Sequence, residues 1–246
     1  MHAHSNMLKT IKTAIGSYVL LFTYLWVSIA TAETTTNVYL ETSLGIIEIE
    51  LRPDAAPGHV ENFLNYVNDG DFDNSFVHRS VSGFIIQGGG FSYIDQTFGF
   101  VPTDSPIQNE FSLSNTRGTV AMAKAGSDPN SATSQWFINL ADNSANLDLQ
   151  NGGFTVFGVV VKGMDVADAI AALPIINTGS AIGAELPVRN TPIEEPVEWE
   201  NHLVLINRAT ENSFSVPSLP PLGVAVLLMI LAGIKRIDYF VGRSLS

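Results

Sequence analysis

Cysteine is absent from the 246 residues of the sequence. This absence excludes disulfide bonds and thiol chemistry, so the fold has to be held together by its packed core. Export to an oxidising compartment would therefore carry no risk of mispaired thiols.

Basic residues are also scarce. The chain has 12 Lys and Arg residues against 24 Asp and Glu residues, which gives a formal net charge of -12. Because nucleic acids and anionic lipids are bound through clustered positive charge, the composition argues against nucleic acid as a partner. The hydrophobic fraction of 46% is ample for a core, and the length suits one domain with targeting segments.

Residues 1–32 have the layout of a secretory signal peptide. Lys9 and Lys12 precede an apolar run over residues 14–30, and residues 30–32 read Ala-Thr-Ala. Small residues in this arrangement are typical of a cleavage site, so we expect cleavage after Ala32 and export to the periplasm or cell envelope. The alternative is an uncleaved membrane anchor, although the run is shorter than the roughly 20 residues that a spanning helix needs.

The C-terminal segment 211–246 has a second apolar run. A proline-containing stretch at 216–221 leads into apolar residues 222–234, and Lys235 and Arg236 follow. This layout resembles the PEP-CTERM-like sorting tails of some Gram-negative bacteria. The alternative is a plain membrane anchor with the basic pair on the cytoplasmic side. Under either interpretation, the C-terminal segment would tether the domain to a membrane, at least transiently.

The residues between these segments, 33–210, form the predicted domain. Alternating apolar residues over 38–51 predict a hairpin. Apolar residues spaced i, i+3, i+4 and i+7 predict a helix that begins at Pro57 and ends before Gly70, and a second helix is predicted from Met164 to Leu173. Further short strands are predicted at 84–87, 119–123, 136–140, 156–161 and 202–207. This pattern indicates a mainly β fold, a closed barrel capped by two helices.

The first stretch with chemical potential is residues 76–91. It places one cation, Arg79, near Phe84 and Gln87 in a mostly apolar segment, followed by three glycines at 88–90. Glycine allows a sharp turn or a close backbone approach. The alternative interpretation is a strand with a surface arginine and a glycine-rich bend.

The second stretch combines residues 118–126 with 134–139. Small residues around Ala123 would leave an open shelf, Gln135 offers both a donor and an acceptor, and Phe137 offers an apolar wall. The alternative interpretation is a core strand flanked by a polar loop.

Together these stretches resemble the cyclophilins, and most closely their exported bacterial members. The motifs are F-x-H-R at 76–79, G-F-x-x-Q-G-G at 83–89, S-Q-x-F-I at 134–138 and F-G-x-V at 157–160. Several motifs in one order across most of 36–210 are more specific than any one of them. The resemblance implies a closed eight-stranded antiparallel β-barrel capped by two α-helices. It also implies peptidyl-prolyl cis-trans isomerase activity that needs no metal or cofactor.

The resemblance also implies roles for individual residues. Arg79 would be the catalytic guanidinium, Gln87 would hold it in place, and Phe84 would complete the catalytic set. The residues expected to bind the substrate, as walls of the proline pocket or as the border of the peptide groove, are Ile85, Ala123, Lys124, Gln135, Phe137, Leu147 and Phe154.

Five positions depart from the usual pattern of the family. Ser82 stands where proline is usual, Ile85 where methionine is frequent, and Lys124 where asparagine is common. Asn146 replaces an aromatic residue, and Phe154 replaces a histidine found in many members. These changes leave the catalytic set intact but alter the groove, so the peptide preference does not follow from the resemblance.

Two functions remain possible at this level. The first is a monomeric enzyme that accelerates X–Pro isomerisation during the folding of exported proteins. The second is a non-catalytic module that binds proline peptides at the membrane or cell surface. The presence of Arg79, Phe84, Gln87 and Phe137 together favours the enzyme.

Overall fold

The computed structural model describes residues 33–179, 182–183, 185–193 and 197–216. The chain divides into two units, of which Thr35–Ser213 contains the sheet and helices described below, while the other joins Met1–Thr34 with Phe214–Ser246. The predicted signal peptide and almost all of the predicted C-terminal tail lie outside the described residues. None of the described helices has the length and hydrophobicity needed to cross a membrane.

The described residues form a mainly β structure with few helices. The strands are β1 Glu33–Thr42, β2 Gly45–Leu51, β3 Ser75–Phe76, β4 Arg79–Val81, β5 Ile85–Gly88, β6 Phe91–Ile94, β7 Thr97–Phe100, β8 Thr119–Met122, β9 Trp136–Asn139, β10 Val156–Lys162, β11 Ile175–Ile176, β12 Leu186–Pro187 and β13 Leu205–Val216. The α-helices are α2 Pro57–Asp69, α3 Ser144–Leu147 and α4 Met164–Ala171, and the 3-10 helices are η1 Gln150–Gly152 and η2 Trp199–Asn201.

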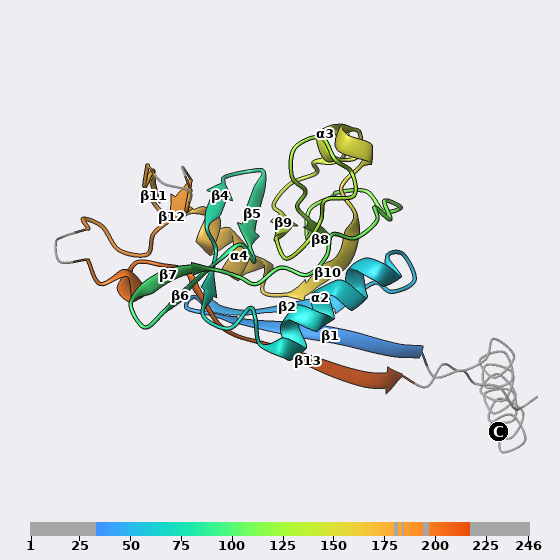
Figure 1. Ribbon diagram of the computed structural model, residues 1–246, viewed down its shortest axis with the longest axis horizontal. Helices are drawn as coiled ribbons and strands as arrows, with labels where there is room; N and C mark the ends of the chain where they lie inside the picture. The colour runs from blue at the N-terminus through green and yellow to red at the C-terminus, as the bar shows by residue number, and fades with distance from the viewer. Residues whose placement is uncertain (1–32, 180–181, 184, 194–196, 217–246) are drawn as a thin grey trace, which may run out of the picture. The chain divides into compact units, whose positions relative to one another are not determined.

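Eleven strands belong to one curled antiparallel sheet (Figure 1), in the order β4-β5-β9-β8-β10-β2-β1-β13-β3-β6-β7. The first ladder along the chain is the predicted hairpin, in which Thr42 of β1 pairs with Gly45 of β2 across a two-residue turn. Side chains on one face of this hairpin are fully or almost fully buried, as their alternation predicted: Val38, Leu40, Ile47, Ile49 and Leu51.

The two predicted helices are present, with slightly different ends. Helix α2 begins at Pro57, where the missing N–H of proline is not needed. It ends at Gly70, which adopts a left-handed φ of 76° and donates its N–H to the carbonyl oxygens of Tyr66 and Val67. Helix α4 ends at Ala171, before the predicted Leu173.

The core under α2 is aromatic. The rings of Phe63 and Phe157 lie 4.8 Å apart, and those of Phe63 and Phe72 lie 5.3 Å apart. All three side chains are fully buried. Burial of this apolar area against the sheet supplies most of the stabilisation of a helix that has no side-chain cap of its own.

Three features were not predicted from the sequence pattern. Residues 91–100 form the hairpin β6–β7, and β13 extends to Val216 rather than ending near 207. The segment between α4 and β13 also forms a small hairpin, in which Ile175 pairs with Pro187 and Ile176 with Leu186. Leu186 is fully buried in a second apolar cluster with Phe76 and Phe91, so this hairpin is anchored close to β4.

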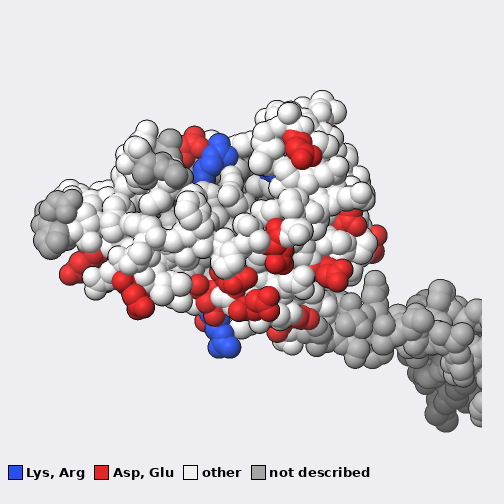
Figure 2. Space-filling model, viewed as in Figure 1, with Lys and Arg blue, Asp and Glu red and all other residues white. Residues whose placement is uncertain are grey.

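Acidic residues dominate one face of the surface. Figure 2 shows them gathered along the lower edge of the view, over α2 and the strands beside it. Burial and the neighbouring carboxylates of Asp69 and Asp104 raise the pKa of Asp71 in this region.

Glu110 connects the loop before β8 to the N-terminus of α2. One carboxylate oxygen accepts the backbone N–H of Gly58 at 3.1 Å, and the other accepts the backbone N–H of His59 at 3.0 Å. The second oxygen also lies 2.8 Å from Nδ1 of His59. Burial alone would raise the pKa of Glu110, but the hydrogen bonds from His59 and from both amides outweigh it and lower that pKa. Glu110 thus acts as the cap that α2 lacks.

We predict that Glu110→Gln lowers the free energy of unfolding by about 1–2 kcal/mol, because the amide loses the charge and places donors against N–H groups. Urea denaturation at pH 7 would measure the effect. Glu61→Gln, on the exposed face of α2, is the matched control and should change stability by less than about 0.5 kcal/mol. Equal effects of the two substitutions would contradict this account of α2.

Candidate active site

The predicted site residues surround a cleft of about 360 Å³. Its walls come from β4, β5, β8, β9 and the loop around α3. The lining residues are Arg79, Phe84, Ile85, Gln87, Ala123, Lys124, Phe137, Asn146, Leu147, Gln150 and Phe154. The structure therefore brings together nine of the ten predicted site residues, although 75 positions separate the first from the last in the sequence.

The tenth predicted residue, Gln135, lines an adjoining cavity of about 130 Å³. The two cavities share Gln87, Ala123 and Lys124 as lining residues. The second cavity is otherwise lined by small and polar side chains: Ala125, Ser131, Thr133 and Gln135. A bound chain could therefore follow one continuous surface from the apolar cleft into a polar one.

The apolar wall of the cleft is a compact cluster. Ile85, Phe137 and Leu147 are each less than 7% exposed and pack together. The ring of Phe154 meets the ring of Phe137 in an edge-on arrangement with centroids 5.8 Å apart. This wall can hold a small apolar ring without offering it any hydrogen bond.

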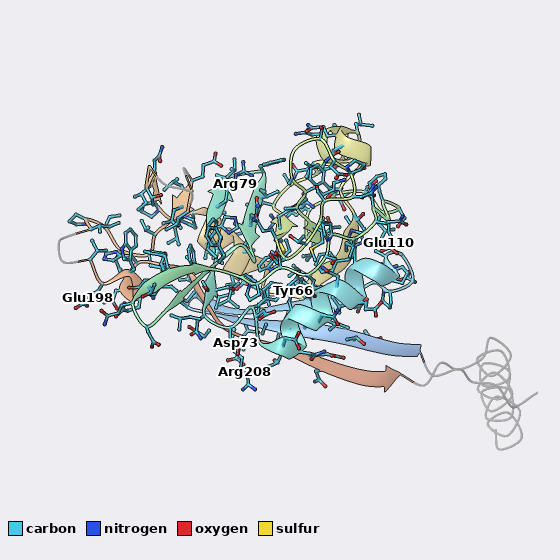
Figure 3. All side chains as sticks on the ribbon, viewed as in Figure 1. Tyr66, Asp73, Arg79, Glu110, Glu198 and Arg208 are labelled. Atoms are coloured by element: carbon cyan, nitrogen blue, oxygen red, sulfur yellow. The ribbon has the colours of Figure 1, made fainter. Side chains whose placement is uncertain are left out.

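Arg79 brings the positive charge to the cleft. Figure 3 shows its side chain at β4, beside β5. Arg79 lies opposite Gln87 in the β4–β5 ladder, so the two residues are neighbours in the sheet. Its Nε, however, donates to Oε2 of Glu185 at 2.6 Å. The hydrogen bonds recorded within the described part of the chain do not join Gln87 to Arg79, so the predicted support of Arg79 by Gln87 is corrected.

Gln87 instead belongs to a different hydrogen bond. Its Nε2 donates to Oε1 of Gln135 at 2.8 Å. Gln135 in turn lies against His78, whose side chain is only 6% exposed. Burial first, and the neighbouring charge of Arg79 second, lower the pKa of His78 from 6.5 to about 4. His78 is therefore neutral at pH 7.

The three glycines after Gln87 let the backbone at the end of β5 approach the side chains of Gln135 and of Trp136 in β9 closely. A Cβ atom on Gly88 would stand 2.8 Å from the ring of Trp136, and one on Gly90 would stand 3.0 Å from the amide of Gln135. Both distances are too short for a side chain to be added without moving its neighbour. The predicted close backbone approach is thus confirmed, and its partner is β9.

Buried asparagines fix the back of the cleft. Asn139, which is fully buried, donates to Oγ1 of Thr119 at 2.9 Å and to Oδ1 of Asn115 at 3.2 Å. It accepts a 2.7 Å hydrogen bond from Asn143, whose Nδ2 also donates to the carbonyl oxygen of Phe84 at 2.9 Å. The backbone of Phe84 is thereby tied to the start of α3.

Asn115 extends this network to the opposite wall. Its Nδ2 donates to the carbonyl oxygen of Phe154 at 2.9 Å and to Oδ1 of Asp148 at 3.0 Å. The backbone N–H of Phe154 donates to the carbonyl oxygen of Leu147 at 3.0 Å. The walls of the apolar cleft are therefore held at fixed separations by polar groups behind them.

Lys124 lines both cavities, and its ammonium is engaged by oxygen atoms of the protein itself. Its ammonium donates to the carbonyl oxygens of Asn151 and Gly153, both at 2.7 Å, and lies 3.4 Å from Oδ1 of Asn109. It also lies 4.8 Å from the ring centre of Phe154. The three donors of the ammonium match these three oxygens, so Lys124 braces the loop that carries Phe154.

Sequence reasoning missed several residues of the site. Gln150 lines the cleft from η1, and Glu185 approaches Arg79 from the segment before β12. Neither belongs to a motif, and Glu185 is 106 positions from Arg79. The asparagines carried a weak signal, because Asn139 and Asn143 flank a predicted strand end, but their burial could not be read from the sequence.

The chain is similar to known proteins in sequence and in fold. The sequence profile described as "Cyclophilin type peptidyl-prolyl cis-trans isomerase/CLD" matches residues 37–196. This chain belongs to the cyclophilin family.

Bacterial cyclophilins are similar to this chain over most of their length. "Peptidyl-prolyl cis-trans isomerase" of Acinetobacter baylyi is 43% identical over 176 residues, which cover 70% of this chain and 87% of the relative. "Peptidyl-prolyl cis-trans isomerase A" of Dickeya dadantii is 45% identical, covering 65% and 80%. "Peptidyl-prolyl cis-trans isomerase B" of Escherichia coli is 42% identical, covering 64% and 96%.

A solved cyclophilin shares the fold. The crystal structure of a cyclophilin-type peptidyl-prolyl cis-trans isomerase of Cryptosporidium parvum, determined in the presence of the dipeptide Ala-Pro, has a TM-score of 0.53 and 22% identity. The match covers 72% of this chain and 98% of that structure. The predicted mainly β, cyclophilin-like fold is confirmed at this level.

We predict that this cyclophilin loses stability as the pH falls below 6.5. The folded pKa of His78 is about 4, below its unfolded value of 6.5, so the unfolded state binds the proton first. The free energy of unfolding should fall by about 3 kcal/mol between pH 7 and pH 4 from this residue. Urea denaturation across that range should show a shallower slope for His78→Asn, and an unchanged slope would contradict the assignment.

We predict that Lys124→Met loosens the cyclophilin cleft. Without the ammonium, two inward carbonyl groups lose their donor, which should cost about 1–2 kcal/mol of stability. The KM for a proline peptide should rise several-fold with a smaller change in kcat, because the Phe154 wall becomes mobile. Lys162→Met, at a side chain that is 83% exposed, is the matched control. An unchanged KM in Lys124→Met would show that the brace is not needed.

Proposed function

We propose that this chain is a peptidyl-prolyl cis-trans isomerase that acts on X–Pro bonds of exported proteins through the guanidinium of Arg79. The observation that carries the proposal is the position of Arg79 at the edge of an apolar cleft walled by Ile85, Phe137 and Leu147. The names of relatives at 42–46% identity support the activity. The cyclophilin crystallised in the presence of Ala-Pro supports a proline segment as the substrate.

The reaction is difficult because the X–Pro bond has partial double-bond character. Rotation about it meets a barrier of about 18–20 kcal/mol, and uncatalysed exchange takes tens of seconds or longer. In the twisted transition state the amide resonance is lost, and the proline nitrogen becomes a better hydrogen-bond acceptor. A group that stabilises this twisted form more than either planar form accelerates the reaction.

The guanidinium of Arg79 meets this requirement. It stays protonated, and a donor aimed at the nitrogen of the twisted bond gains strength as the lone pair localises. Because Nε is engaged by Glu185, the terminal nitrogen atoms would be the donors that reach the X–Pro bond. No proton transfer, nucleophile or metal ion is required for this step.

The rest of the site would hold the peptide during rotation. The apolar wall would grip the proline ring, so that the residue before it rotates against a fixed partner. The amide groups of Gln87 and Gln135 lie along the path into the second cavity and offer donors and acceptors to the peptide backbone. The polar character of that cavity fits a main chain rather than a large apolar side chain.

The location and finer architecture belong to the same proposal. The signal peptide predicted over residues 1–32 supports action in the periplasm or cell envelope. The apolar tail supports a membrane tether, and a monomer is sufficient because the cleft is built from one chain. The hydrogen bonds Val77 N–Val204 O and His78 N–Gln87 O, at 3.0 and 3.1 Å, support closure of the curled sheet into the eight-stranded barrel of the family.

A proline-binding module without catalysis is the alternative, and a coupled proline-isomerisation assay on the full chain separates the two. We predict that the wild type is active and that Arg79→Ala lowers kcat/KM by about 100-fold or more, since a donor aimed at the transition state is lost. Arg208→Ala, at an exposed residue of β13, is the control and should match the wild type. An inactive wild type that still binds Ala-Pro peptides would favour the binding module.

A further inference from the structure

We propose that Glu185 is a positioning residue that holds the guanidinium of Arg79 in its working orientation. Oε2 of Glu185 accepts the Nε–H of Arg79 at 2.6 Å, the shortest contact recorded for either side chain in the described part of the chain. The inference rests on the proposed isomerase function. In this proposal Glu185 supports Arg79 in place of Gln87, because Gln87 donates its hydrogen bond to Gln135.

The backbone of Glu185 is itself fixed next to Arg79. The N–H of Ser80 donates to the carbonyl oxygen of Glu185 at 2.8 Å. The preceding Gly183 packs so closely on the carbonyl oxygen of His78 that an added Cβ would stand 2.8 Å from it. The segment that carries Glu185 therefore meets the chain on both sides of Arg79, through the hydrogen bond to Ser80 and the close approach of Gly183 to His78.

The next residue anchors the segment in the core. Leu186 is fully buried with Phe76 and Phe91, and β12 pairs with β11 through it. The carboxylate thus projects from the residue directly before an anchored strand. A catalytic group is positioned precisely when the residue that orients it is itself held in place, and Glu185 meets this condition.

The contact with Glu185 involves Nε of Arg79 and not its terminal nitrogen atoms. A guanidinium has five N–H donors, and Glu185 engages the one on Nε. Within the described part of the chain, the four on the terminal nitrogen atoms make no hydrogen bond. Arg79 still lines the cleft while it is paired, so the ion pair orients the side chain without withdrawing it from the site.

The exposure of the pair shows why it affects orientation more than stability. The side chains of Arg79 and Glu185 are 36% and 41% exposed. Ion pairs this exposed contribute little to the free energy of unfolding. Restricting the rotamers of a long, flexible arginine, however, removes conformations in which its donors miss the twisted amide.

The test is a coupled isomerisation assay on the full chain with Glu185→Gln and Glu185→Ala. We expect kcat to fall roughly threefold to tenfold in Glu185→Ala, with KM and the melting temperature nearly unchanged. Glu185→Gln keeps a neutral acceptor and should lose less. Glu61→Gln removes the same charge far from the cleft and should match the wild type.

A double substitution shows whether Glu185 acts through Arg79. In an Arg79→Ala background, Glu185→Ala should cause no further loss, because the group it orients is gone. An equal loss in both backgrounds would overturn the proposal. So would wild-type kinetics in Glu185→Ala, and so would a faster enzyme, which would show that Glu185 restrains Arg79 instead of positioning it.

A spectroscopic measurement on the wild type needs no variant of Glu185 to fold. The Nε–H resonance of Arg79, assigned by its loss in Arg79→Lys, should be shifted and protected from solvent exchange by the charge-assisted hydrogen bond. A resonance that exchanges as fast as that of exposed Arg208 would overturn the proposal. The isomerase function would fail separately, through an inactive wild type or a fully active Arg79→Ala.

Discussion

Pairing of the buried amide of Asn139 is the constraint on which the shape of the cleft depends. A buried amide left without partners costs about 1–3 kcal/mol, so its surroundings have to supply them. Asn139 is satisfied by Thr119, Asn115 and Asn143. Through these partners it reaches the backbone of Phe84 on one side of the cleft and of Phe154 on the other. The walls of the apolar cleft are thereby held in place by a polar network that lies behind them.

A permanent positive charge at the cleft edge imposes a second constraint. Arg79 cannot lose its proton, so its neighbours adapt to it. The pKa of His78, directly beside it, falls to about 4 through burial and through that charge, and the ring stays neutral. Glu185 supplies the opposite charge from a distant segment. Arg79 thus keeps its charge at the edge of a cleft that has an apolar wall.

The predictions from the sequence were accurate where contiguous motifs lie on paired strands. Arg79 and Gln87 face each other because β4 and β5 form an antiparallel ladder, and Phe137 joins them through β9. The glycines at 88–90 were predicted to allow a close approach, which β9 provides. The sequence did not identify Glu185 as the partner of Arg79, or the oxygen atoms that Lys124 binds, because a long side chain can reach several acceptors and the sequence does not rank them.

The sequence by itself indicated the family, the mainly β fold and most of the residues that line the cleft, because alternation and motif order are local properties of the chain. The tertiary structure decided which charges and amides meet. Glu185 reaches Arg79 across 106 positions, and Lys124 reaches the carbonyl oxygens of Asn151 and Gly153 across 27 and 29 positions. Such contacts depend on how the curled sheet brings separate loops together, and no local pattern encodes that arrangement.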